Sequence, residues 1–126
     1  MAQRILVVED DPHILLSLEF LLRHAGYDVT ISDHGEKAHA ALAHLSFDLV
    51  VLDVMLPGID GLELCRRLRA APGTRATKIL MLSARGRDGE IEAGLTLGAD
   101  AYMTKPFGTR EFLETVTRLL RPSAES

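Results

Sequence analysis

The amino-acid sequence predicts an α/β fold in which a doubly wound, five-stranded parallel sheet carries helices on both faces. Short apolar runs rich in β-branched residues alternate along the chain with longer segments of helical periodicity. Three of these runs are apolar throughout, which is typical of strands covered on both faces. Strict alternation of strand and helix, joined by right-handed crossovers, produces a sheet of this kind.

The five predicted strands lie at residues 5–8, 27–31, 49–52, 79–82 and 101–103. The first, third and fourth are the continuously apolar runs, which suits strands with helices above and below them. Residues 27–31 instead alternate between apolar and polar side chains, a pattern that favours an edge strand.

The segments between the strands carry the helices. The first has Pro12 in its first turn and Gly26 after its end, the usual positions of these residues. The second is expected to open at Asp33, with Glu36 as its capping partner three residues later. The apolar stripes that define the five helices are Ile14, Leu15, Leu18, Leu21, Leu22 and Ala25; Ala38, Ala41, Leu42 and Leu45; Leu64 and Leu68; Ile91 and Leu95; and Phe112, Leu113, Val116, Leu119 and Leu120.

Length and composition restrict the class of protein. The 126 residues, 47% of them hydrophobic, can bury the core of one domain, which we expect to span residues 1–121 with a tail or the start of a linker at 122–126. The formal net charge of -4 argues against a nucleic-acid-binding surface, and no apolar run is long enough to cross a membrane. A single cysteine favours a reducing compartment, so we expect a cytoplasmic protein.

Polar residues follow four of the predicted strands. Glu9 and Asp10 follow the first, Asp53 the third, Ser83 the fourth and Lys105 the fifth. The carboxyl ends of parallel strands meet at one edge of the sheet, where open α/β sheets bind ligands, so we expect these groups to converge. Clustered carboxylates repel one another, and Mg²⁺, which prefers oxygen ligands, would relieve that repulsion. Together with the lysine and the hydroxyl, they predict a site for a transferring phosphoryl group, with a carboxylate available as nucleophile.

Simpler roles are expected for other polar residues. Asp11 is expected to cap the first helix, and Cys65 to pack in the core. Two sets of basic residues are expected to be solvated rather than to bind a ligand: His34, His39 and His44, and Arg66, Arg67 and Arg69.

Taken in order, these motifs resemble those of response-regulator receiver domains of two-component systems. The resemblance covers residues 5 to about 120 and lies in four motifs: VVEDD, LDVMLPGIDG, MLSA and YMTKPF. It implies a flavodoxin-like strand order 2-1-3-4-5, of which the chemotaxis regulator of this family is a standard example. It also implies a cis peptide bond between Lys105 and Pro106.

The resemblance assigns a role to each site residue. Asp53 would accept a phosphoryl group from the phosphohistidine of a histidine kinase, or from a phosphotransfer protein. Lys105 and Ser83 would bind the phosphoryl oxygens, and Tyr102 would turn inward when Ser83 moves toward the phosphate. Arg85 is expected to lean toward the phosphoryl group and to affect its lifetime.

The resemblance also implies a set of Mg²⁺ ligands. Asp10 and Asp53 would bind the ion directly, and the backbone carbonyl of Met55 would complete the shell. Glu9 would act indirectly, through water. It stands where aspartate is more usual and adds one methylene while keeping the charge.

The expected function is a phosphorylation-activated signalling switch that catalyses only its own phosphorylation and dephosphorylation. Phosphorylation would change the face formed by the fourth helix, fifth strand and fifth helix, and so control an output domain, an effector protein or a homodimer. The cognate kinase, the signal and the output stay open.

There are three alternative functions. A protein-binding module that is never phosphorylated is one. A haloacid-type aspartyl phosphohydrolase would carry a second aspartate where Met55 stands. A flavin or nucleotide binder would need a glycine- and hydroxyl-rich loop after the first strand, where Glu9, Asp10 and Asp11 would instead repel phosphate.

Overall fold

All the strands run parallel and form one sheet in the order β2-β1-β3-β4-β5. The computed structural model describes residues 2–84 and 88–121. The strands are β1 (Arg4–Val8), β2 (Asp28–Ser32), β3 (Leu49–Asp53), β4 (Lys78–Ala84) and β5 (Ala101–Lys105). The predicted fold class and strand order are therefore confirmed, with the alternating run at an edge.

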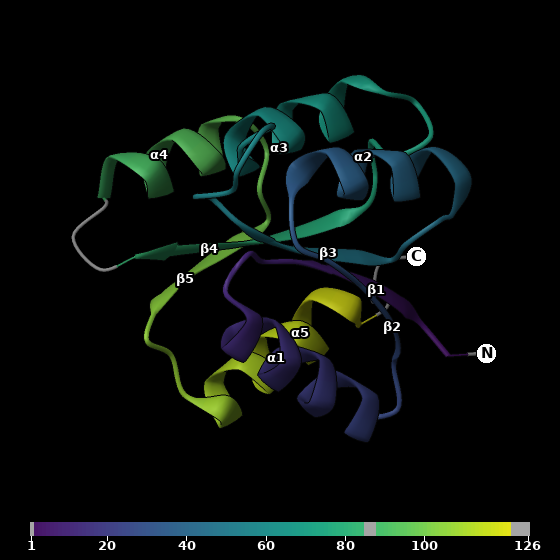
Figure 1. Ribbon diagram of the computed structural model, residues 1–126, viewed down its shortest axis with the longest axis vertical. Helices are drawn as coiled ribbons and strands as arrows, with labels where there is room; N and C mark the ends of the chain where they lie inside the picture. The colour runs from purple at the N-terminus through teal and green to yellow at the C-terminus, as the bar shows by residue number, and fades with distance from the viewer. Residues whose placement is uncertain (1, 85–87, 122–126) are drawn as a thin grey trace.

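Helices cover both faces of the sheet (Figure 1). One layer contains α1 (Pro12–His24) and α5 (Thr109–Leu120); the other contains α2 (Gly35–His44), α3 (Gly61–Ala70) and α4 (Asp88–Thr96). None of the helices in the described part of the chain has the length and apolar character needed to cross a membrane.

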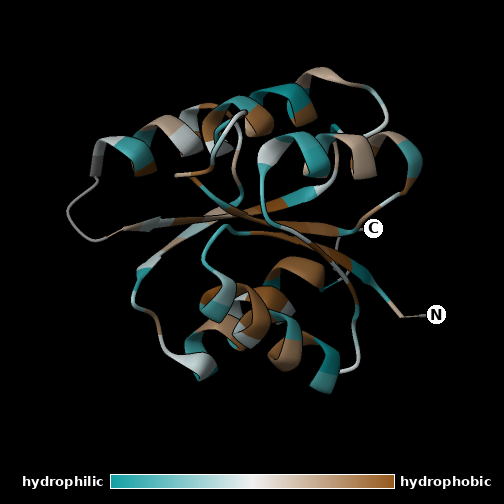
Figure 2. Cartoon of the chain, in the orientation of Figure 1, coloured by the Kyte–Doolittle hydropathy of each residue, from teal (hydrophilic) through white to brown (hydrophobic). Residues whose placement is uncertain are grey.

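The central strands are apolar throughout because they supply two separate cores. In β1, Ile5 and Val7 pack in the cluster under α1 and α5, whereas Leu6 and Val8 pack in the cluster under α2 and α3. Figure 2 shows the result, with hydrophobic strands lying between two layers of helices that carry both hydrophobic and hydrophilic residues. The sheet is therefore a rigid support for the residues at the carboxyl ends of the strands.

The helix caps are partly as expected. Asp11 caps α1, since its Oδ1 accepts a hydrogen bond from the His13 N–H at 2.9 Å. The expected Asp33–Glu36 cap of α2 is wrong. The cap is His34, whose Nδ1 accepts from the Lys37 N–H at 3.3 Å. Helix α2 begins at Gly35, which lies against the Ile59 backbone, where a Cβ would overlap the carbonyl oxygen.

The arginines of α3 fall into two groups. Arg66 and Arg67 lie on the surface and pair with Glu63, as expected of a solvated face. Arg69 does not fit that expectation. Its guanidinium donates to Asp100 at 2.8 Å, to the Gly98 carbonyl at 2.9 Å, and to two further carbonyls before β4. The prediction of a solvated Arg69 is therefore wrong, because its length lets it tie the end of α3 to the starts of β4 and β5.

Three residues of the predicted apolar stripes lie outside the core, and one of them is Ala25, which is exposed just after α1. Leu45 is 45% exposed and stands just after α2, and Leu95 on α4 is 43% exposed. Cys65 is fully buried, as expected, and His39 and His44 are exposed.

Candidate functional site

The structure brings four of the predicted site residues together at the carboxyl ends of β1, β3 and β5. Carboxylate oxygens of Glu9, Asp10 and Asp53 lie within 4.8 Å of one another. The Lys105 Nζ lies 2.9 Å from Glu9 Oε1 and 3.1 Å from Asp53 Oδ2. The register explains this convergence, since the end of β3 pairs with Leu82 on β4 and Lys105 pairs with Ala84.

Burial makes the negative charges of this cluster costly in free energy. Glu9 is fully buried and Asp53 is 3% exposed, so neither charge is compensated by bulk water. Backbone N–H groups partly stabilise the two negative charges: the Asp11 N–H donates to Glu9 at 3.2 Å, and the Met55 N–H donates to Asp53 at 3.3 Å. Within residues 2–84 and 88–121, Lys105 is the cationic partner of both carboxylates.

The pKa values show how the groups compete. Burial raises the pKa of Glu9 above its ordinary value, and the neighbouring Asp53 raises it further. Partial burial and the adjacent Glu9 also raise the pKa of Asp10. Burial alone would lower the pKa of Lys105, but its bonds to Glu9 and Asp53 outweigh that effect, and the net shift is upward. The raised pKa values of Glu9 and Asp10 show that ionisation of these carboxyl groups is opposed by burial and by their acidic neighbours.

The donor set fits a hard divalent cation. Three carboxylates lie close to one ammonium group. Each offers a carboxylate oxygen as a metal ligand, and oxygen is the ligand type that Mg²⁺ prefers. Asp10 is the exposed member and lies open to solvent. The backbone of Met55 is held against Asp53 by its N–H bond, while the Met55 side chain is 52% exposed.

Ser83 and Tyr102 stand apart from this cluster. Ser83 is 1% exposed, and its Oγ lies 3.2 Å from Glu90 Oε1 on α4 and 3.4 Å from the Ala84 carbonyl. Among the described hydrogen bonds, none joins Ser83 to Asp53 or Lys105. Tyr102 on β5 is 46% exposed, and Arg85 lies outside the described residues.

Sequence reasoning missed Glu90. It follows Ser83 by seven residues and lies on a different element, so no helical or strand spacing links the two positions. Only the three-dimensional fold brings these two side chains together.

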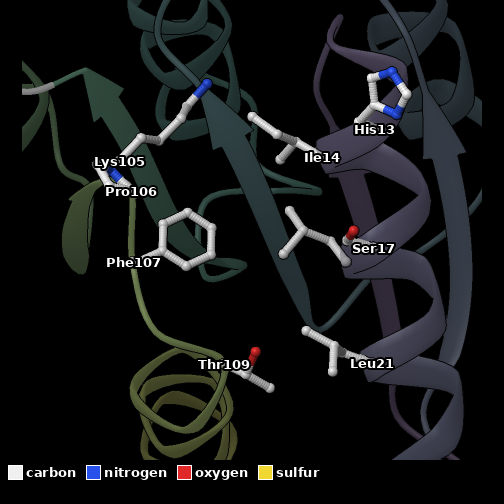
Figure 3. Close-up of a pocket in the computed structure, with 9 residues that line it drawn as sticks. His13, Ile14, Ser17, Leu21, Lys105, Pro106, Phe107 and Thr109 are labelled. Atoms are coloured by element: carbon white, nitrogen blue, oxygen red, sulfur yellow. The ribbon is translucent and has the colours of Figure 1, made fainter.

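A cavity of about 500 Å³ lies beside the site, between α1 and the connection from β5 to α5 (Figure 3). Apolar side chains of α1, including Ile14 and Leu21, face Phe107 across it, and Lys105 lines its upper end. The Lys105–Pro106 peptide bond is cis, as the resemblance implied. The cavity and the acidic cluster therefore share Lys105.

Comparison with known sequences agrees with this geometry. The response regulator receiver domain family matches residues 5–117. The chain is 43% identical over 121 residues to the phosphate regulon transcriptional regulatory protein PhoB of Rhizobium meliloti, covering 96% of this chain and 53% of that protein. It is 44% identical over 123 residues to the alkaline phosphatase synthesis transcriptional regulatory protein PhoP of Bacillus subtilis, covering 98% and 50%. The chain thus spans about half the length of these relatives.

Solved structures show the same fold. The chemotaxis response regulator CheY4 of Vibrio cholerae superposes with a TM-score of 0.89 at 29% identity, covering 95% of this chain and 100% of that one. The receiver domain of the sensor histidine kinase PA1611 from Pseudomonas aeruginosa, solved with a magnesium ion coordinated in its active site cleft, gives 0.87 at 32% identity, covering 95% and 98%. Fold, acidic cluster and sequence together show that this chain belongs to the response regulator receiver domain family of two-component signal transduction.

Proposed function

We propose that this chain is a phosphorylation-controlled switch in which Asp53 accepts a phosphoryl group from the phosphohistidine of a histidine kinase or phosphotransfer protein. The placement of the Asp53 carboxylate carries the proposal, since it is buried, 3.1 Å from Lys105, at the edge of the sheet where the acidic pair lies. An Asp53 oxygen would attack phosphorus while the phosphorus–nitrogen bond to the donor imidazole breaks. Lys105 would then bind a phosphoryl oxygen.

Mg²⁺ belongs to the same proposal. Asp10, Asp53 and the backbone carbonyl of Met55 would hold the ion, and Glu9 would act indirectly. The ion pair between Glu9 and Lys105 supports the indirect role, because it occupies one Glu9 oxygen. When bound, Mg²⁺ would neutralise negative charge on the phosphoryl oxygens.

The cavity beside Lys105 supports the approach of a protein phosphodonor. A donor histidine must reach Asp53, and the walls of this cavity offer apolar surface next to the site, within reach of the same partner. A phosphodonor that packs against α1 would bring its imidazole to the acidic edge.

The output would be read from the face formed by α4, β5 and α5. Leu95 and Tyr102 are large exposed side chains on this face, and Tyr102 would turn inward with Ser83. We propose that the face controls an output domain, an effector protein or a homodimer formed on activation. In this proposal the domain spans residues 1–121, has no nucleic-acid or membrane partner of its own, and acts in the cytoplasm.

The deciding experiment is incubation with acetyl phosphate and Mg²⁺, read by intact mass. The wild-type chain should gain the mass of one phosphoryl group, and Asp53→Asn should gain none. Asp48→Asn is the matched control, because Asp48 is an exposed carboxylate just before β3, at the opposite end of that strand. A gain in Asp53→Asn equal to wild type would refute Asp53 as acceptor, whereas no gain in the wild type would favour the unphosphorylated binding module.

A further inference from the structure

The hydroxyl of Ser83 has a defined partner. The Ser83 Oγ lies 3.2 Å from Glu90 Oε1 and 3.4 Å from the Ala84 carbonyl oxygen. A serine hydroxyl has a single proton to donate, and a carboxylate is a stronger acceptor than a neutral carbonyl. The proton is therefore directed at Glu90, on the first turn of α4.

The pleat of β4 explains why Ser83 meets α4. Side chains two residues apart in a strand lie on the same face of the sheet. Met81 packs in the core on the side of α2 and α3, so Ser83 is directed to that side as well. Leu82, which pairs with Asp53, packs in the opposite core under α1 and α5.

We propose that Glu90 is a positioning residue that holds the Ser83 hydroxyl away from the phosphoryl site until Asp53 is modified. This inference rests on the proposed function, in which Ser83 binds a phosphoryl oxygen. To donate its one proton to that oxygen, Ser83 must give up the bond to Glu90. Phosphorylation of Asp53 then releases the contact between the end of β4 and the first turn of α4, which couples the chemistry to the position of this helix.

The coupling has a measurable consequence. Breaking the Ser83–Glu90 bond opposes the binding of a phosphoryl group or its analogue, so removing the Glu90 carboxylate should tighten that binding. A hydrogen bond to a charged, partly exposed acceptor of this kind corresponds to roughly fivefold to tenfold in a dissociation constant.

Titration with beryllofluoride and Mg²⁺, followed by NMR, tests the idea. Glu90→Ala should bind about fivefold or more tightly than wild type. Glu92→Ala is the matched control, since Glu92 is an exposed carboxylate on the same helix. It should bind as the wild type does. In the unbound Glu90→Ala protein, the amide signals of residues 91–96 should also move toward their positions in the bound wild type.

A double-mutant cycle separates the hydrogen bond from simple charge repulsion. If Glu90 acts through Ser83, Ser83→Ala and the double variant Ser83→Ala/Glu90→Ala should bind the analogue equally. An undiminished effect of Glu90→Ala in the Ser83→Ala background would overturn the inference, as would unchanged affinity in Glu90→Ala alone. Failure of the proposed function looks different, because then the wild type itself would not bind beryllofluoride, or Asp53→Asn would bind it equally well.

Discussion

Replacing Asp10 with asparagine should make the metal-free protein more stable while removing its response to Mg²⁺. Asp10 lies with Glu9 and Asp53 in a cluster whose carboxylate oxygens are within 4.8 Å of one another. Asparagine keeps the shape of the side chain and removes the charge. The variant therefore relieves repulsion in the metal-free state and deletes a proposed ligand.

The magnitude follows from Coulomb's law. Two unit charges 4.8 Å apart repel by about 3.5 kcal/mol at an effective dielectric constant of 20. Asp10 is exposed and Lys105 offsets part of the repulsion, so solvent screening reduces the expected gain to about 1 kcal/mol. For a chain of this size that corresponds to roughly 3–5 °C in Tm.

The direction in which pH changes the stability gain of Asp10→Asn can also be predicted. The pKa of Asp10 is raised in the folded state, so the folded protein binds this proton more readily than the unfolded chain. The destabilisation caused by the Asp10 charge is therefore absent at pH values below the pKa of Asp10 in the unfolded chain. It develops as the pH rises through the pKa of Asp10 in the folded protein. The advantage of Asp10→Asn should be present at pH 7 and should vanish below about pH 4.

Thermal unfolding in EDTA and in Mg²⁺ measures both effects. Wild type should gain about 1.4 kcal/mol when Mg²⁺ is at ten times its Kd, and Asp10→Asn should gain little. The control is Asp11→Asn, which removes a neighbouring charge but keeps the helix cap, because asparagine caps as well as aspartate. A variant Asp10→Asn that is less stable than wild type in EDTA, or that responds to Mg²⁺ as wild type does, would refute the reasoning.

Three further predictions concern the individual side chains of Lys105, Arg69 and Cys65. Lys105→Met should lower the free energy of unfolding by about 2 kcal/mol at pH 7 in urea titrations, because it leaves Glu9 buried without its cation. Burial raises the pKa of Glu9, so the loss should shrink as the pH is lowered and Glu9 takes up a proton. A loss that stays constant with pH would contradict this account. Arg69→Ala should cost about 2 kcal/mol in the same assay, whereas Arg66→Ala, which removes only a surface ion pair, should cost less than about 0.5 kcal/mol; equal losses would show that the Arg69 contacts do not stabilise the fold. The thiol of Cys65 is fully buried and burial raises its pKa, so a thiol reagent should modify it only at the rate of unfolding.

Much of the fold could be predicted because the sheet is covered on both sides. Residues 5–8 and 49–52 are apolar at every position, and only a strand between two helical layers buries all of them. The parallel direction then placed the residues after each strand at one edge, so the grouping of Glu9, Asp53 and Lys105 could be anticipated without coordinates.

What could not be predicted depends on contacts between elements. Charge pattern made Arg69 look like its neighbours on α3, but its partners lie before β4 and β5, about 30 positions away in the case of Asp100. Local sequence likewise favoured Asp33 as a helix cap. In the structure α2 instead begins at Gly35, which lies against Ile59 far along the chain, and His34 is the cap. The contact between Ser83 and Glu90 likewise joins two different elements, so it could not be predicted from the local sequence.

Packing identifies α4 as the element that is least costly to move. Helix α5 buries Phe112, Val116 and Leu120, and α3 likewise buries a row of apolar side chains. Within the described side chains of α4, none is buried, and the helix approaches the sheet through Gly94, which has no side chain to pack. Elements with few buried apolar contacts shift at a low cost in free energy. The hydrogen bond from Ser83 to Glu90 is one of the contacts at the start of α4, and its loss would weigh more there than on α5, which has core contacts of its own. In the proposed switch, this difference in packing would let a change at Asp53 reach α4 through the Ser83 hydroxyl.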